Sequence, residues 1–480
     1  MYNKLLAPIL GLFIATSPAL AGAPRAKAIE NSVARAIAQS TKRGISAVSD
    51  NFKLAAKYRT TMFNRFLKYT TYDSQSNDNM DITPEQIETA KKLYEEVKAF
   101  GFPTQLSEHY YIYVEVPSNI QKPVATLGFS CHYDTTPDIL GKGIKAQVIE
   151  EYNGKPVVLK DGHFIDFNSD PYLKEMIGKK IVTSDGTTML SSDDKAGVSI
   201  MVTLLQTLAE HPEKKHGKIQ VVITPNEDVG RSADYIEETP YHPDIAFDFD
   251  GGVDGEVVIG NFNAEKVLYH VIGVNGHQSH AAHNGYKNAW KPACELGAAL
   301  SKDEWLPNHS DGDQGYVELH HMGMVNGKMS EAELDFRLRS FKQADIEKWK
   351  EYAQAQAEII SKKYDVQIER EVVKQYQNVA ENIHAAAKTV VEKAFNRAGV
   401  KPNFKEERAG TTASMLMLKL GNGAYTIFTG QNNPHNFTEW LSEDDMFKAY
   451  IVALNMIDEM LQVPAPASAS APASFHPAEK

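Results

Sequence analysis

The chain has 480 residues, which is long enough for more than one domain and a sizeable apolar core. Its hydrophobic share of 42% and charged share of 23% are ordinary for a globular protein. Acidic residues outnumber basic ones, 62 against 50, and the net charge of −12 argues against nucleic acid or anionic membrane as a general partner. The two cysteines, Cys131 and Cys294, form no CxxC pair, so we expect free, mostly buried thiols.

The first residues have the pattern of a secretory signal peptide. Lys4 gives a positive start, an apolar run follows at 5–15, and the Ala-Leu-Ala sequence at 19–21 fits a cleavage site. The apolar run is shorter than the roughly 18–20 residues that a membrane-spanning helix needs. We therefore predict a signal peptide over 1–21 and an exported protein, periplasmic or secreted, with no membrane span after cleavage.

Helices and strands alternate in the residues that follow. Apolar spacing predicts a helix over 52–69, and Thr83, Pro84 and Gln86 have the pattern of a capped start for a second helix. The further predicted elements are strands at 110–116, 124–129, 219–223 and 245–249, a hairpin of 146–152 with 155–159, and a helix at 196–210. This alternation indicates an α/β domain with a largely parallel sheet.

From about Phe262 the pattern changes to a β-α-β-β-α-β order. Its predicted elements lie at 267–274, 288–302, 316–324, 331–341, 343–364 and 366–373. That order is the ferredoxin-like split unit, which we predict to be an inserted α+β lid. Helices at 380–398, 412–418 and 442–461 and a strand at 424–428 return the chain to the first domain. The catalytic domain is thus predicted to comprise two segments, 47–261 and 377–462, with the lid at 262–376 between them and a disordered Pro/Ala/Ser-rich tail at 463–480.

Five residues of metal-ligand type fall at predicted strand ends or helix starts: His132, Asp193, Asp228, Asp250 and His435. Each alone has an ordinary explanation, such as a helix cap for Asp193 or a turn for Asp250. Together they fall beyond the carboxyl ends of one sheet, where α/β proteins place their sites. A pair of divalent cations with one bridging carboxylate explains the set. Nitrogen and oxygen ligands without cysteine fit zinc, with cobalt or manganese as alternatives.

Two carboxylates beside these residues suit supporting roles. Asp134 lies two residues after His132 at a strand end, so both side chains point the same way and the carboxylate can hold the second ring nitrogen. Glu227 precedes Asp228, and adjacent side chains diverge, so one can bind metal while the other faces the substrate. Water between two metal ions has a pKa of about 7 rather than about 15.7, and Glu227 is placed to act as its general base and later as an acid.

The motifs together resemble the metallopeptidases of the M20 clan, and within it the peptidase T group of tripeptide aminopeptidases. The motifs that carry this resemblance are 65–69 with 73–76, 132–138, 193–197, 224–230, 250–252, and 428–430 with His435 and Glu439. The resemblance implies a zinc-peptidase-like catalytic domain with a lid, Asp193 as the bridging ligand, and His132 and Asp250 on different metals. It also implies Asp228 and His435 as ligands.

Three further residues carry over from the same resemblance. His277 matches a lid histidine that stabilises the oxyanion, in some relatives from a partner subunit, and dimers through the lid occur among related proteins. Arg408 matches a residue that contacts the substrate backbone or carboxylate, and Arg339 is a second candidate for that contact. The chain departs from the family in having Asp228 instead of Glu, and in lacking a carboxylate at Thr412, which puts tripeptide selectivity in doubt.

We therefore predict a dizinc exopeptidase that releases N-terminal residues from short peptides, with metal-bound hydroxide as the attacking group. One alternative is an M20-type amidohydrolase that removes an acyl group from an N-acyl amino acid. Another is an inactive exported protein that binds peptides, although an intact Glu227 argues against it. The sequence contains neither a G-x-S-x-G nor an H-E-x-x-H motif, which argues against serine hydrolases and one-metal proteases of those types.

Overall fold

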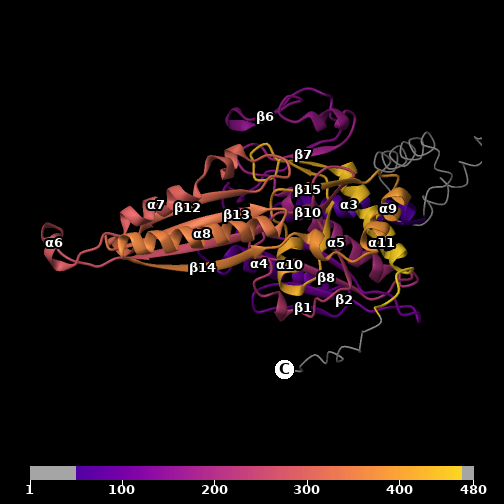
Figure 1. Cartoon of the computed structure of the whole chain (residues 1–480). Helices are drawn as coiled ribbons and strands as arrows, with labels where there is room; N and C mark the ends of the chain where they lie inside the picture. Colours follow the sequence, from indigo (N-terminus) through magenta and orange to yellow (C-terminus); the bar gives the residue numbers. More distant parts are fainter. Residues whose placement is uncertain (1–49, 467–480) are drawn as a thin grey trace, which may run out of the picture.

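The computed structural model describes residues 50–466, which form a large helix-covered sheet and a second α/β unit that projects from it (Figure 1). The predicted signal peptide at 1–21 and nearly all of the predicted tail at 463–480 lie outside the described residues. Within the described range, none of the helices combines the length and the apolar content needed to cross a bilayer.

The first unit is built on an eight-stranded sheet with the order β1-β2-β8-β3-β9-β16-β10-β15. The strands are Thr104–Leu106 (β1), Ile112–Val116 (β2), Leu127–His132 (β3), Ile219–Thr224 (β8), Ile245–Gly251 (β9), Glu256–Asn261 (β10), Asn403–Glu407 (β15) and Ala424–Phe428 (β16). The middle group β8-β3-β9-β16 is parallel, whereas β1-β2, β2-β8 and β16-β10 pair antiparallel. The predicted α/β class with a mostly parallel sheet is confirmed.

Helices cover both faces of this sheet. They are Asp50–Tyr69 (α3), Pro84–Lys98 (α4), Ser192–Glu210 (α5), Ala387–Ala398 (α9), Thr412–Leu420 (α10) and Glu443–Met460 (α11). One face packs against α3, α4, α5, α9 and α11, and the other packs against α10. Every residue of β3 and β8 is buried, as expected for central parallel strands covered on both sides. The capping box of Thr83 and Gln86 is present at the start of α4, as predicted.

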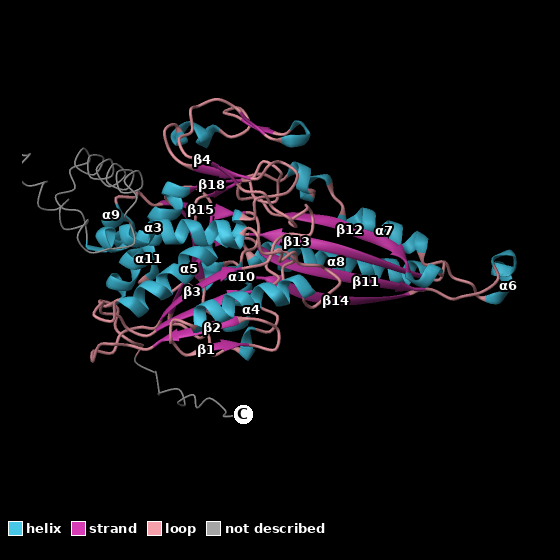
Figure 2. Ribbon diagram, turned by 180° about the vertical axis from the view of Figure 1, so that it is seen from behind, coloured by secondary structure: helices cyan, strands magenta, loops and turns pink. Residues whose placement is uncertain are grey.

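The second unit, which we call the lid, has the predicted β-α-β-β-α-β order. Its elements are Asn263–Ile272 (β11), Ala281–Asn284 (α6), Trp290–Leu300 (α7), Tyr316–Met324 (β12), Glu331–Ser340 (β13), Gln343–Tyr364 (α8) and Gln367–Tyr376 (β14). The strands form an antiparallel sheet in the order β12-β13-β11-β14, and α7 and α8 pack against it. Figures 1 and 2 show α6 at the tip of the lid, at the opposite end of the molecule from α9 and α11.

Three buried asparagines join the two chain segments that connect the lid to the first unit. The side chain of Asn378 accepts a hydrogen bond from the Asn261 N–H at 3.0 Å, and the side chain of Asn263 accepts one from the Asn378 N–H at 2.9 Å. The Asn261 side chain also accepts one from the N–H of Val379 at 2.9 Å. Because these groups are buried, each hydrogen bond satisfies a polar atom that water does not reach. The entrance and exit of the lid are therefore fixed side by side.

The predicted hairpin of 146–152 with 155–159 is wrong. The segment instead supplies β4 (Gln147–Ile149) and β5 (Val157–Val158), which belong to two different sheets. One sheet has the order β17-β18-β7-β4, with β7 (Ile181–Thr183), β17 (Gln431–Asn432) and β18 (Trp440–Ser442), and the other consists of β5 and β6 (Phe164–Ile165). Strand β4 pairs with β7, and β5 pairs with β6. A separate apolar cluster explains the difference, because Tyr152, Leu159 and Ile165 pack with Trp440, which is distant in sequence.

Smaller corrections concern short edge elements and one cysteine. Strands β1, β7, β10, β15, β17 and β18 were not predicted, because runs of two to six residues carry little periodicity. The helix predicted over 380–398 begins only at Ala387, since Ile383 pairs with Gly423 as an isolated bridge. Both cysteines are free as expected, but only Cys131 is buried, and Cys294 is exposed.

Candidate metal centre

The five predicted ligands come together at the carboxyl edge of the parallel strands. His132 ends β3, Asp250 lies near the end of β9, and Asp193 lies in the first turn of α5. Asp228 follows β8, and His435 lies in the loop between β17 and β18. In such a sheet the carboxyl ends of neighbouring parallel strands lie along one edge, so residues that are distant in sequence meet there.

The Asp193 carboxylate lies between the two imidazoles. Its Oδ1 is 2.9 Å from His132 Nε2, and its Oδ2 is 3.3 Å from His435 Nε2. Asp250 Oδ1 is 3.6 Å from His132 Nε2, whereas Asp228 Oδ1 is 2.6 Å from His435 Nε2. The expectation that His132 and Asp250 serve different metals is therefore wrong, because they lie on the same side of Asp193. The residues form two donor groups that share one carboxylate.

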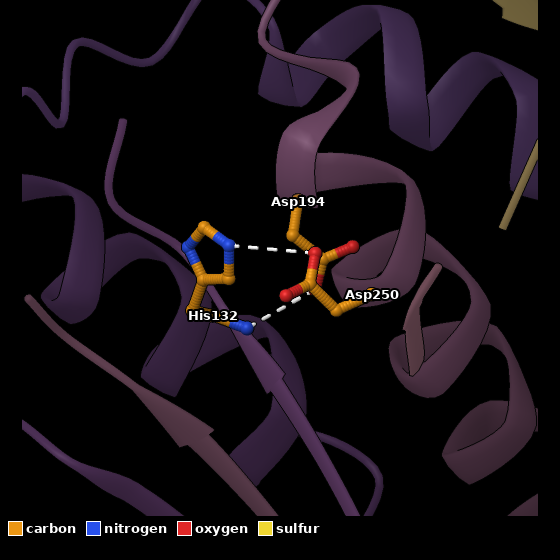
Figure 3. Close-up of side chains that lie close together, drawn as sticks. All are labelled: His132, Asp194 and Asp250. Atoms are coloured by element: carbon orange, nitrogen blue, oxygen red, sulfur yellow. Dashed lines mark hydrogen bonds and ion pairs between the residues drawn. The ribbon is translucent and has the colours of Figure 1, made fainter. Parts of the chain in front are cut away.

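The fully buried Asp194 lies beneath His132 and was not singled out from the sequence. Figure 3 shows the carboxylates of Asp194 and Asp250 close together on one side of His132, with one contact to its ring and one to its backbone nitrogen. Asp194 Oδ2 accepts the backbone N–H of His132 at 3.1 Å, and its Oδ1 accepts the N–H of Gly197 at 2.9 Å. Both oxygens thus bind backbone donors. Although Asp194 lies close enough to belong to a ligand group with His132 and Asp250, its contacts are those of a support for the β3 end and the start of α5.

Asp134 lies on the other side of the His132 ring and is fully buried. Its Oδ1 is 3.3 Å from His132 Nδ1. The same carboxylate accepts the backbone N–H groups of Glu227 at 2.9 Å and of Asp228 at 3.3 Å. One side chain therefore contacts the imidazole and also binds the backbone of the segment that carries the Glu227–Asp228 pair, a link that the sequence did not reveal.

The charge balance of the site fits divalent cations. Burial, with a further contribution from the charge of Asp193, raises the pKa of Asp228 to about 7 and of Asp250 to about 6. Hydrogen bonds to Asp193 and Asp228 raise the pKa of His435 to about 11. Within residues 50–466, Asp228 Oδ2 is buried without a hydrogen-bond partner. Nitrogen and oxygen donors with excess negative charge and a free carboxylate oxygen are the properties of a site for hard or borderline divalent ions.

Glu227 faces the same cluster without bonding to it. Its Oε2 is 3.9 Å from His132 Nε2, and its side chain is 12% exposed. Burial, together with the charges of Asp250 and Asp228, raises the pKa of Glu227 well above its usual range. A partly accessible carboxyl with a raised pKa beside a candidate metal site has the position that general acid–base chemistry requires.

The structure does not bring the other three predicted residues into the cluster. His277 is exposed just before α6 at the tip of the lid, and its Nδ1 contacts Ser279 Oγ at 2.7 Å. Arg408 donates to the lid loop, to the carbonyls of Gly312 at 2.9 Å and Gln314 at 2.8 Å and to the Ser310 side chain at 2.7 Å.

Arg339 lies on β13, and its guanidinium donates to the side-chain oxygen of Gln375 at 2.9 Å. It lies over the ring of Tyr376 at 5.3 Å from the centroid. In this conformation both predicted substrate-binding arginines therefore contact the lid or its connection to the first unit.

Two residues around His435 contact the ligands but received no role from the sequence. The Gln431 amide donates to the Asp250 carbonyl at 2.8 Å and to its carboxylate at 3.2 Å. The carboxylate of Glu439 binds the segment that carries Asp193. Glu439 belongs to one of the motifs that carry the family resemblance, but that motif assigned it no role, and for Gln431 the only available signal was its position four residues before His435.

A mostly parallel sheet with an inserted lid, and two donor groups joined by one carboxylate at the strand ends, define a metal-dependent hydrolase. Residues 183–459 match the peptidase family M20/M25/M40. Peptidase T of Desulfitobacterium hafniense is 35% identical over 410 residues, covering 83% of this chain and 98% of the relative. Peptidase T of Clostridium novyi is 33% identical over 404 residues, covering 82% and 98%.

Solved structures show the same fold. The aminopeptidase PepT from Bacillus cereus has a TM-score of 0.62 and 20% identity, covering 84% of this chain and 99% of that one. The YXEP protein of Bacillus subtilis, described as a dinuclear metal binding peptidase, has a TM-score of 0.59 and 12% identity, covering 85% and 99%. The chain belongs to the peptidase family M20/M25/M40 and is a hydrolase of peptide bonds.

Proposed function

We propose that this protein is an exported two-zinc aminopeptidase that releases the N-terminal residue from short peptides. The observation that carries the proposal is the Asp193 carboxylate, whose two oxygens face one imidazole each. The relatives named peptidase T support the preference for a free N-terminus over an N-acyl group. Zinc fits the donor set best, with cobalt and manganese as alternatives.

In this proposal, His132, Asp193 and Asp250 would hold one ion, and Asp193, Asp228 and His435 would hold the other. When bound, the ions supply a Lewis acid that polarises the peptide carbonyl and lowers the pKa of water. Asp228 fills the place where the resembled family has Glu, and its Oδ1 already reaches within 2.6 Å of His435 Nε2. The shorter side chain therefore still reaches the second donor group.

Glu227 transfers a proton from the attacking water to the leaving amine, a role that requires a carboxyl within reach of the reacting atoms. Asp134 binds the backbone N–H of Glu227 at 2.9 Å and lies 3.3 Å from the His132 ring, so the base and the ligand keep a fixed relation. Movement of a lid over the site would exclude water and complete the substrate contacts.

The substrate carboxylate is assigned to Arg408, with Arg339 as a second candidate. A guanidinium binds a carboxylate in two parallel hydrogen bonds, and Arg408 uses both terminal nitrogens here, Nη1 toward the Gln314 carbonyl and Nη2 toward the Ser310 hydroxyl. Arg408→Ala is expected to raise KM for a tripeptide about tenfold or more with little change for an amide-capped tripeptide. Equal losses for both substrates would reject this assignment.

His277 is assigned to oxyanion stabilisation from a partner subunit, in a homodimer formed through the lid. The support is that His277 is exposed and lies just before α6, the helix that Figures 1 and 2 show at the lid tip, remote from the first unit. The test mixes two inactive variants, His277→Ala and Glu227→Gln, after denaturation and refolding together. Recovered activity would support the shared site. A monomeric mass in solution, or no recovery from a proven heterodimer, would reject it.

The central test is a substrate panel with Ala-Ala-Ala, Ala-Ala and N-acetyl-alanine, with and without a chelator. The proposal predicts chelator-sensitive release of alanine from a peptide with a free amine, and its loss in Glu227→Gln. Activity on the acetylated substrate alone would make the protein a deacylase. No release of alanine from any of the three substrates would favour a peptide-binding role. Export is tested separately, by whether the protein made in a bacterium with two membranes is found cleaved near Ala21 in the periplasm.

A further inference from the structure

A single fully buried carboxylate, Glu439, binds the whole segment that leads into the Asp193 ligand. Its Oε2 accepts the backbone N–H groups of Leu190 at 2.8 Å and Ser191 at 2.9 Å. Its Oε1 accepts the Ser192 hydroxyl at 2.6 Å and the backbone N–H of Asp193 at 3.1 Å. Each carboxylate oxygen thus has two donors, which fills its lone pairs and leaves Glu439 unsuited to bind a metal ion itself.

This segment would not hold its shape unaided. Ser191 has φ 61° and ψ 34°, the left-handed region that costs an L-residue other than glycine roughly 1 kcal/mol or more. The side chain of Ser191, although at the N-cap of α5, makes no capping hydrogen bond within the described chain. Glu439 supplies acceptors to this segment instead, because it satisfies two buried backbone N–H groups before the helix and the N–H of Asp193.

Glu439 is itself held on a rigid support. It directly precedes β18, whose first residue, Trp440, is fully buried and donates its indole N–H to Asp170 at 2.6 Å. Strand β18 pairs with β7 on one side and with β17 on the other. The loop between β17 and β18 also carries His435. Glu439 therefore connects the backbone of Asp193 to the loop of the imidazole that Asp193 Oδ2 faces at 3.3 Å.

We infer that Glu439 is a positioning residue that sets the Asp193 carboxylate between the two donor groups and so determines the affinity of the second ion. The inference rests on the proposed two-ion function. Groups that orient a metal ligand through hydrogen bonds typically change metal affinity 10- to 100-fold when they are removed. The effect falls on the His435 side, because His132 has its own supports in Asp134 and the buried end of β3.

The test compares zinc binding of the full chain with that of Glu439→Gln, Glu439→Asp and Glu265→Gln, measured by titration calorimetry and by zinc content after dialysis. In Glu439→Gln an amide N–H₂ replaces one acceptor and faces a donor, so we expect the weaker zinc site to lose about 10- to 100-fold in affinity. Glu265→Gln is the matched control, because this buried lid carboxylate accepts from Gln343 at 2.6 Å and Lys350 at 2.7 Å. It should retain both ions.

Glu439→Asp keeps the charge with a shorter side chain, so it should recover some of the lost affinity, and it serves as the second variant if Glu439→Gln does not fold. Two ions bound with unchanged affinity in both Glu439 variants would overturn the inference, even if their thermal stability fell as in Glu265→Gln. Fewer than two ions bound by the unaltered chain would overturn the two-ion function together with the inference. The two failures are therefore distinguishable.

Discussion

The two imidazoles of the centre are held in different ways. His132 ends a buried central strand and is 0% exposed, whereas His435 lies in a loop and is 41% exposed. His435 also has φ 57°, in the left-handed region that few residues adopt without support. The comparison shows that one donor group is built into the sheet, while the other depends on loop contacts such as those of Glu439. We therefore expect the two groups to respond differently to substitution, chelation and pH.

The largest effect should come from the residue that both groups share. Asp193→Asn keeps the size of the side chain but removes its charge, so both ions should be lost or greatly weakened. We expect kcat/KM to fall by about 10³-fold or more and the zinc content to fall toward zero. Asp228→Asn is the comparison variant, which should weaken only the ion on the His435 side. If Asp193→Asn still bound two ions tightly, Asp193 would not be the ligand that the two donor groups share.

Glu227→Gln should separate proton transfer from metal binding. The amide cannot accept the proton, so kcat should fall by about 10²- to 10⁴-fold, while the zinc content stays that of the unaltered chain. Steady-state kinetics with a tripeptide and metal analysis of the same sample measure both quantities. A fall in zinc content in step with the activity would show that Glu227 is a ligand and not a base.

The difference between the imidazoles should also appear in stability without metal. His132→Ala leaves Asp134, Asp193 and Asp250 without their buried partner, so we expect a loss of about 2 kcal/mol or more in the free energy of unfolding. His435→Ala removes the partner of Asp193 and Asp228 at a half-exposed position, so solvent screens part of the contact and the loss should be smaller than that of His132→Ala. Denaturant unfolding of both variants in the presence of a chelator measures this. Equal losses would contradict the division into a built-in and a loop-held group.

The smallest effect concerns pH. The folded-state pKa values of Asp228, about 7, and Asp250, about 6, lie above their ordinary value of 3.8. Between pH 3.8 and these values, the folded metal-free protein therefore binds more protons than the unfolded chain. Its stability should therefore fall as the pH rises from about 4 to 7. Bound zinc keeps both groups ionised and should flatten this slope. Melting temperatures at pH 5 and pH 7.5, with zinc and with chelator, test the difference, and parallel slopes would contradict it.

The ligands could be predicted from the sequence because each follows a recognisable element. His132 and Asp250 end buried strands, and Asp193 opens an apolar helix, so topology alone brings them to one edge. The lid was equally predictable, since its long strands and helices have clear periodicity. The role of Glu439 was not predictable, although the residue belongs to a family motif, because nothing local distinguishes a glutamate with four buried donors from a solvated one.

The errors have a common physical cause, which is that partners distant in sequence decide short elements. The segment 146–159 has the pattern of a hairpin, yet Tyr152 and Leu159 pack on Trp440 and direct the strands to other partners. The positions of Arg408 and His277 depend on how the lid is placed and on what it contacts. No pattern within a single stretch of sequence contains that information.

The asparagine contacts at the base of the lid have a consequence for protein engineering. Asn261 and Asn378 are joined by a hydrogen bond of 3.0 Å, so the chain leaves the first unit and returns to it at nearly the same point. A gene in which a short glycine-containing turn connects these two residues would encode the eight-stranded sheet as one continuous polypeptide. We expect such a lidless protein to fold and retain zinc, which would make the lid a module that can be exchanged between relatives to alter which peptides are accepted.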